Sequence, residues 1–139
     1  MDKQTGWKPI PLPLKILFVA FVLWSTGSLF AIPARYELGL PFFGVFVYGI
    51  AASLIVLLLD IVGPITFLFA LWNRKYWGPS FAFSYIAVFI LNTSAAIFTF
   101  REQLRLMPIF IPLLVNVAFV ITIYQSRSYF MQNHTNISR

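Results

Sequence analysis

Cysteine is absent from this chain of 139 residues, and histidine occurs once, at His134. Without cysteine the chain has no disulfide, no thiolate metal site and no cysteine nucleophile. A single histidine in the polar C-terminal segment cannot supply the paired ligands of a haem, copper or catalytic zinc site in a membrane. A hydrolytic triad would also lack its base. We therefore expect neither a metal nor another cofactor.

Acidic residues are scarce as well. The four acids are Asp2, Glu37, Asp60 and Glu102. They lie on different segments, so the sequence offers no evident pair of carboxylates for acid–base catalysis. Glycine motifs that bind phosphates or dinucleotides are also lacking. We predict that the chain is not an enzyme.

Charge of either sign is sparse: 10% of the residues are charged and 60% are hydrophobic. A soluble domain normally carries about 25% charged residues, so this chain has too little polar surface for a globule in water. Lipid must be the solvent for much of it. The formal net charge is +6, but the basic residues lie at the ends of apolar runs. There they act as topology signals and contacts for anionic lipid, and we expect no nucleic-acid partner.

Four stretches are apolar enough to cross roughly 30 Å of hydrocarbon, which takes about 20 helical residues. They predict an all-α fold, an integral membrane four-helix bundle that forms one domain over residues 1–139. Short links force neighbouring helices to run antiparallel. The four expected spans cover approximately 13–32, 49–72, 80–100 and 107–124.

The second apolar run, residues 41–72, is too long for one untilted span and too short for two. Pro41, Gly44 and Gly49 all weaken a continuous helix. They favour a short interfacial or re-entrant segment over residues 40–48, followed by a span that begins near Gly49. One long, tilted helix is the alternative.

Lysine and arginine are distributed unevenly between the two sides of the expected spans. One side holds Arg35, Arg101 and Arg105. The other side holds Lys3, Lys8, Lys15, Arg74, Lys75, Arg127 and Arg139. Cytoplasmic loops carry the excess of basic residues. We therefore predict a multi-pass protein of the cell (plasma) membrane with both termini in the cytoplasm.

A few polar side chains interrupt the apolar spans. Asp60, Asn92 and Asn116 lie near the middle of three different spans, and Trp24 lies at a similar depth in the first. At a rise of 1.5 Å per residue, the two asparagines and Asp60 fall within about one helical turn of the bilayer midplane. Each expected helix thus offers a hydrogen-bonding group at the same level.

Asp60 most needs an explanation, because an acid within a membrane helix is costly. Pro64 has no N–H for the carbonyl four residues back, which is that of Asp60. Transporters use carboxylates and freed carbonyls at this depth to bind small cations. The alternative is that the polar groups only hold the helices together. The candidate binding residues are Asp60, Asn92, Asn116, Thr66 and Trp24.

Short motifs mark the ends of the first two spans. A proline-rich basic start precedes the first span, a PxFG-like stretch opens the second, and an LW-x-R-K-x-W block ends it. The residues concerned are Pro9, Pro11, Pro13, Pro41, Phe43, Gly44, Leu71, Trp72, Arg74, Lys75 and Trp77. This layout resembles small prokaryotic four-span membrane proteins of unknown function. The resemblance covers most of the chain and carries over no functional residue.

Two functions fit these features. The first is a non-enzymatic accessory, assembly or regulatory subunit that acts through helix and lipid contacts. Its partners would be the lipid bilayer and either further copies of the chain or a larger membrane complex. This function predicts that Asp60→Asn is tolerated. The second is a small oligomeric transporter or channel with a cation or proton site at Asp60, for which the same substitution abolishes flux.

Overall fold

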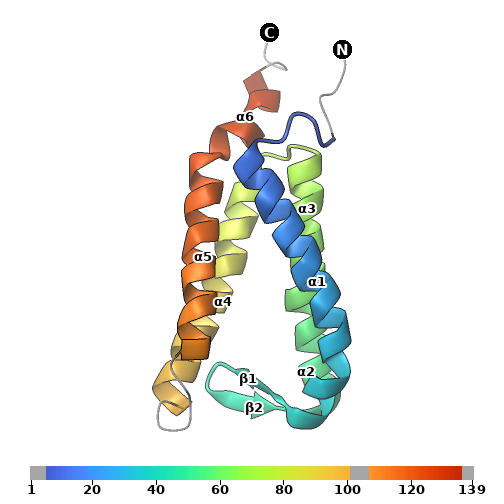
Figure 1. Cartoon of the computed structure of the whole chain (residues 1–139), viewed down its shortest axis with the longest axis vertical. Helices are drawn as coiled ribbons and strands as arrows, with labels where there is room; N and C mark the ends of the chain where they lie inside the picture. The colour runs from blue at the N-terminus through green and yellow to red at the C-terminus, as the bar shows by residue number, and fades with distance from the viewer. Residues whose placement is uncertain (1–5, 101–106, 136–139) are drawn as a thin grey trace.

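The computed structural model describes residues 6–100 and 107–135 (Figure 1). The described part is mostly helical, as the all-α expectation requires, but it also contains one short β hairpin. Arg101 and Arg105, which the sequence places on the less basic side, lie outside the described residues.

Helix α1 spans Leu12–Leu38. Prolines suit its first turn, because the N–H groups there have no partner within the helix. The first expected span ends near residue 32, but the helix continues through Pro33 for another turn and a half. Pro33 removes only one backbone hydrogen bond, and the residues that follow it are mostly good helix formers. Gly39 ends the helix with a φ of 81°, and its N–H donates to the Arg35 carbonyl.

The segment expected to be interfacial or re-entrant forms a β hairpin. Strand β1 (Leu40–Phe42) pairs antiparallel with β2 (Val45–Val47), in the register Leu40↔Val47. The two turn residues, Phe43 and Gly44, both have positive φ, 45° and 81°. Positive φ at both central positions is typical of tight hairpin turns, although phenylalanine is an uncommon residue there.

One helical stretch follows the hairpin, from Gly49 to Trp72. It consists of α2 (Gly49–Val56), a π-helical segment η1 (Leu57–Val62) and α3 (Gly63–Trp72). Each N–H of a π-helix bonds to the carbonyl five residues back. Accordingly, the N–H of Gly63 donates to the carbonyl of Leu58. Asp60 therefore lies in a wider helical turn than an α-helix would give it.

Further helices follow in the described chain. Helix α4 spans Gly78–Phe100, α5 spans Met107–Gln125 and α6 spans Arg127–Thr135. Helix α6 turns back over the end of the molecule, where the fully buried Phe130 ring lies against Phe67 of α3 with their centroids 6.4 Å apart.

The helices form two arms (Figure 1). Helix α1 packs along α2, η1 and α3, and α4 packs along α5. The arms meet at the end where α1 begins and α6 lies, and they diverge toward the hairpin at the opposite end. Phe21 joins the arms, with its ring 5.5 Å from Phe67, 6.2 Å from Tyr85 and 5.2 Å from Phe119. The core gathers at the closed end and comprises Ile10, Leu14, Leu17, Phe21, Phe67, Leu71, Ala82, Tyr85, Ile86, Ile123, Tyr129 and Phe130.

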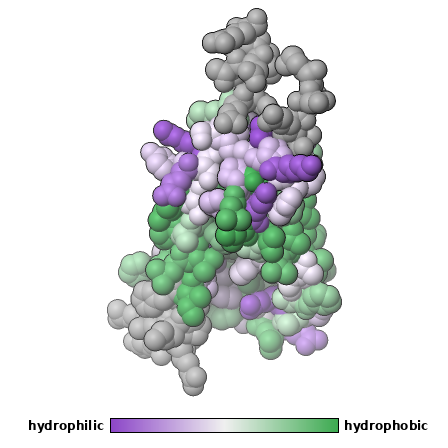
Figure 2. All heavy atoms as spheres, turned by 45° about the horizontal axis from the view of Figure 1, so that its top comes forward, coloured by the Kyte–Doolittle hydropathy of each residue, from purple (hydrophilic) through white to green (hydrophobic). Residues whose placement is uncertain are grey.

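Within the described residues, three helices are long and apolar enough to cross a membrane: Leu12–Leu38, Gly49–Trp72 and Gly78–Phe100. A shorter apolar helix covers Ile111–Gln125. Hydrophilic side chains gather around the end that carries α6, above a band of hydrophobic ones (Figure 2). This division is the one expected where a helical bundle leaves hydrocarbon for an aqueous interface.

Candidate functional site

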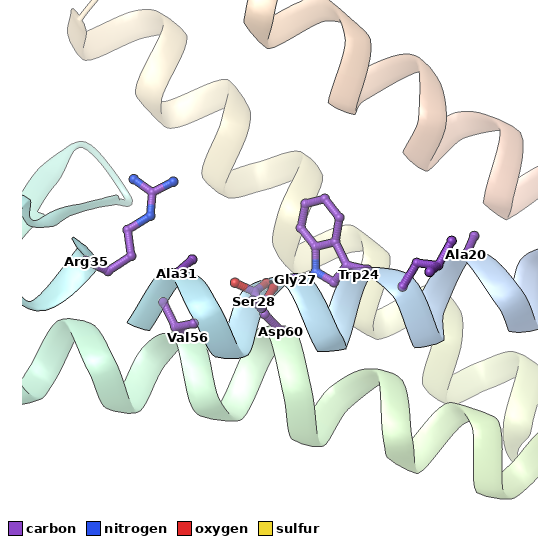
Figure 3. A pocket seen from close by; sticks show the side chains of 9 residues that line it. Ala20, Trp24, Gly27, Ser28, Ala31, Arg35, Val56 and Asp60 are labelled. Atoms are coloured by element: carbon purple, nitrogen blue, oxygen red, sulfur yellow. Dashed lines mark hydrogen bonds between the residues drawn. The ribbon is translucent and has the colours of Figure 1, made fainter. Parts of the chain in front are cut away.

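An open groove runs along α1 and contains Asp60. It has a volume of about 560 Å³, and we call it the α1 groove. Most of its wall comes from one face of α1, and α2 and η1 supply the rest (Figure 3). Its lining residues are Ala20, Leu23, Trp24, Gly27, Ser28, Ala31 and Arg35 of α1, with Val56 and Asp60.

The carboxylate of Asp60 meets the indole of Trp24 in this groove. The Trp24 Nε1–H donates to Oδ1 of Asp60 at 3.3 Å. The Trp24 side chain is 50% exposed, and Asp60 is half-buried. The two residues that the sequence places at the same depth on the first and second spans are therefore in contact.

Small residues line the groove between Trp24 and Arg35. A Cβ atom added to Gly27 would meet nothing within 4 Å, and Ala31 lies one turn further along the same face. Arg35 lies 11 residues beyond Trp24, which is roughly 16 Å along a helix axis. The groove thus contains both an acid, Asp60, and a cation, Arg35.

The helical register at Pro64 decides which carbonyl lacks a backbone donor. The sequence assigned it to Asp60, four residues back, because an α-helical register was assumed. In the π register the partner of Pro64 is five residues back, at Leu59. The hydroxyl of Tyr85 on α4 donates to the Leu59 carbonyl at 2.7 Å. This bond satisfies the carbonyl and ties α4 to η1.

Tyr85→Phe should therefore destabilise the fold by about 1–3 kcal/mol, because it leaves the Leu59 carbonyl without a donor. The cost should shrink when Pro64→Ala supplies a backbone N–H to this turn. Thermal unfolding in detergent of the two single variants and the double variant measures this coupling. Tyr36→Phe is the matched control, because Tyr36 is 51% exposed. If Tyr85→Phe lowers the free energy of unfolding equally with and without Pro64, then Leu59 does not carry the carbonyl that Pro64 leaves without a donor.

The other candidate residues make hydrogen bonds elsewhere. Oδ1 of Asn92 accepts the Phe43 N–H at 2.7 Å, which fixes the hairpin turn to α4. Nδ2 of Asn116 donates to the carbonyl of Pro112 in its own helix at 2.8 Å. Thr66 donates to Val62, also within its helix, at 2.7 Å. The structure thus brings Trp24 to Asp60 and gives both asparagines and Thr66 other hydrogen-bond partners.

Two residues at this site were not among the sequence candidates. Arg35 was expected to lie beyond the first span, although its place one turn after Ala31 puts it on the groove face if the helix continues. Tyr85 is the hydroxyl donor that a proline within an apolar helix requires from a neighbouring helix. The sequence does not pair Tyr85 with the Leu59 carbonyl, because it does not reveal the helical register at Pro64.

No family model matches this chain, and no curated protein or solved structure is detectably similar to it. The interpretation of the groove consequently rests on its own geometry and chemistry.

Proposed function

We propose that this protein is a non-enzymatic, multi-pass subunit of the cell membrane that binds a partner transmembrane helix in the α1 groove. In this proposal α5 is the fourth span and both termini are cytoplasmic. One observation carries it: Asp60, near the middle of its span, lines an open groove instead of the packed core.

The hydrogen bonding of Asp60 supports a partner. A charged side chain at the centre of a membrane helix costs about 2.5–3.5 kcal/mol on insertion scales. A carboxylate accepts at about four sites, whereas Trp24 supplies one donor at 3.3 Å. A lysine, arginine or hydroxyl side chain of a partner helix at this depth would supply the missing donors. Intramembrane acids are commonly paired in this way.

The shape of the groove supports a helix as the partner. Gly27 and Ala31 are one turn apart and carry small or no side chains, which lets the backbone of a second helix approach closely. Ser28 adds a hydroxyl beside them. The open space over Gly27 shows that no element of the described chain fills this position.

Site-directed photo-crosslinking in native membranes tests the proposal. A photoreactive phenylalanine at Ala31, which lines the groove, should give a discrete adduct. The same group at Leu29 is the matched control, because Leu29 is 51% exposed but does not line the groove. Mass spectrometry of the adduct should find a membrane-spanning peptide with a basic or hydroxyl side chain. Such side chains are the donors that Asp60 lacks.

A blocking variant sharpens the crosslinking experiment. Gly27→Leu should abolish the Ala31 adduct without unfolding the protein, since the added side chain enters open space. Gly27→Ala should leave most of it, because one methyl group fills little of the groove. Adducts of equal yield at Ala31 and Leu29, or an Ala31 adduct that survives Gly27→Leu, would refute a helix-binding groove.

The transporter remains a second candidate, in which the protein is a small oligomer and Asp60 binds a cation or proton. The observation in its favour is the π-helical turn at Asp60, since such turns occur frequently at functional sites. Asn92 and Asn116 bond to groups other than Asp60. This weighs against a cation site in which both asparagines join Asp60. Flux measurements on an Asp60 variant separate the two candidates.

A further inference from the structure

A second, smaller pocket lies between α1 and α3, near the end that carries α6. Its volume is about 290 Å³, and we call it the α1–α3 slot. The lining is almost wholly apolar, with one amide at its rim. The residues are Phe18, Ile65, Leu68, Phe69, Trp72 and Asn73.

Aromatic side chains surround the mouth of the slot. The Phe18 ring lies between Trp72, at 6.1 Å, and Trp7, at 5.4 Å between ring centroids. Trp7 precedes α1, and a Cβ on its neighbour Gly6 would lie 3.8 Å from the Trp72 ring. The chain before α1 therefore folds back beside the slot. Tryptophan is enriched at the boundary between lipid and water, so this cluster marks the headgroup level.

A lysine stands at the same level. Lys15 lies one helical turn before Phe18, and its ammonium group is 5.5 Å from the centre of the Trp7 ring. Further cations cover this end: Arg74 lies over Tyr129 at 4.5 Å and Arg127 over Tyr124 at 4.9 Å. Of the acids in the described residues, Glu37 lies at the far end of α1 and Asp60 lies in the α1 groove. This end of the protein is thus basic, and Lys15 is the cation that its contact with Trp7 places beside the slot.

We propose that the α1–α3 slot binds one anionic phospholipid from the leaflet at this end of the protein. An acyl chain occupies the apolar slot, and the phosphate lies against the ammonium group of Lys15. The charge of Lys15 selects an anionic headgroup, because a basic residue near the membrane surface contributes roughly a fivefold preference for anionic lipid. The site is independent of the α1 groove and of the partner helix proposed for it.

Quenching of tryptophan fluorescence by brominated lipids tests this site in reconstituted vesicles. The variant Trp24→Phe/Trp77→Phe retains Trp7 and Trp72, the two tryptophans at the slot. Dibrominated phosphatidylglycerol should reach half-maximal quenching at a roughly fivefold lower mole fraction than dibrominated phosphatidylcholine. Lys15→Gln in this background should remove the preference, and Lys15→Arg should keep it.

Lys75→Gln is the matched control, because Lys75 is an exposed cation at the same end of the protein, whereas Lys15 is the cation that lies over Trp7 beside the slot. It should leave the preference for phosphatidylglycerol unchanged. Equal losses in Lys15→Gln and Lys75→Gln would show only general attraction of lipid to a basic surface and would overturn the proposal. So would the absence of any preference in the starting variant. Circular dichroism of each variant verifies that its helices are intact.

Discussion

Asp60→Asn should lower the yield of the Ala31 photo-adduct by about 10- to 100-fold while the protein remains folded. A hydrogen bond to a charged group contributes about 1.5–3 kcal/mol, and each 1.4 kcal/mol is about a factor of ten in an equilibrium constant. The amide of asparagine has the size of the carboxylate but carries no charge. A cationic or hydroxyl donor of the partner helix would lose most of its attraction to it.

The folded state should tolerate the same change. The amide oxygen of the substituted asparagine can still accept the Trp24 N–H, which is the hydrogen bond that Asp60 makes in the structure. We therefore expect the thermal unfolding midpoint of Asp60→Asn to match that of the parent protein. An adduct that is undiminished in Asp60→Asn would contradict a role for this carboxylate in partner binding. The sequence alone predicts that an accessory subunit tolerates this substitution, and binding of a partner through Asp60 departs from that prediction because only folding would tolerate it.

Flux in proteoliposomes distinguishes the second candidate function. A transporter that uses Asp60 as its cation or proton site should carry ions when purified and reconstituted alone, and Asp60→Asn should abolish that flux. A subunit that acts by binding a partner should give no flux above empty vesicles in either form. Measurable flux that is unchanged by the substitution would exclude the transport role of Asp60.

The sequence predicts the helices better than it predicts the contacts between them. Long apolar runs must be helical in lipid because every backbone group needs a partner. Depth along each span, calculated from the helical rise, puts Trp24 and Asp60 at one level, and the two side chains meet. Depth does not give the rotation of a helix about its axis. Asn116, at the same depth, bonds to its own helix instead.

Two features of the site depend on interactions that the sequence does not reveal. In the π-helical register the carbonyl five residues before Pro64 is that of Leu59, to which Tyr85 donates. Nothing in the sequence of η1 distinguishes this register from the α-helical one. Asn92 was expected to bond to the other helices, but its side-chain oxygen accepts the N–H of Phe43 in the hairpin turn. That N–H belongs to the hairpin turn, and the sequence does not reveal that this turn lies against α4.

Gly63→Ala should destabilise the fold by about 1–3 kcal/mol, the usual cost of overpacking a filled core. An added Cβ would lie 2.9 Å from Cδ2 of Tyr85 and 3.2 Å from its Cζ. The Tyr85 ring cannot move away freely. It stacks on Phe81 at 6.1 Å between centroids, and its hydroxyl donates to Leu59. The clash outweighs the helix propensity that alanine gains over glycine, which is at most about 1 kcal/mol.

Gly27→Ala is the matched control for Gly63→Ala, because both glycines lie inside helical stretches. It should be neutral or slightly stabilising, since the new methyl group meets nothing within 4 Å and alanine favours the helix. Reversible unfolding in mixed micelles measures both changes. The Tyr85→Ala background then identifies the cause, because it removes the ring that the methyl group would strike. Gly63→Ala should cost little in that background. A cost that persists without the ring would show that Gly63 serves the backbone of the π-helical turn, and that the close approach of α4 to η1 is not what requires glycine there.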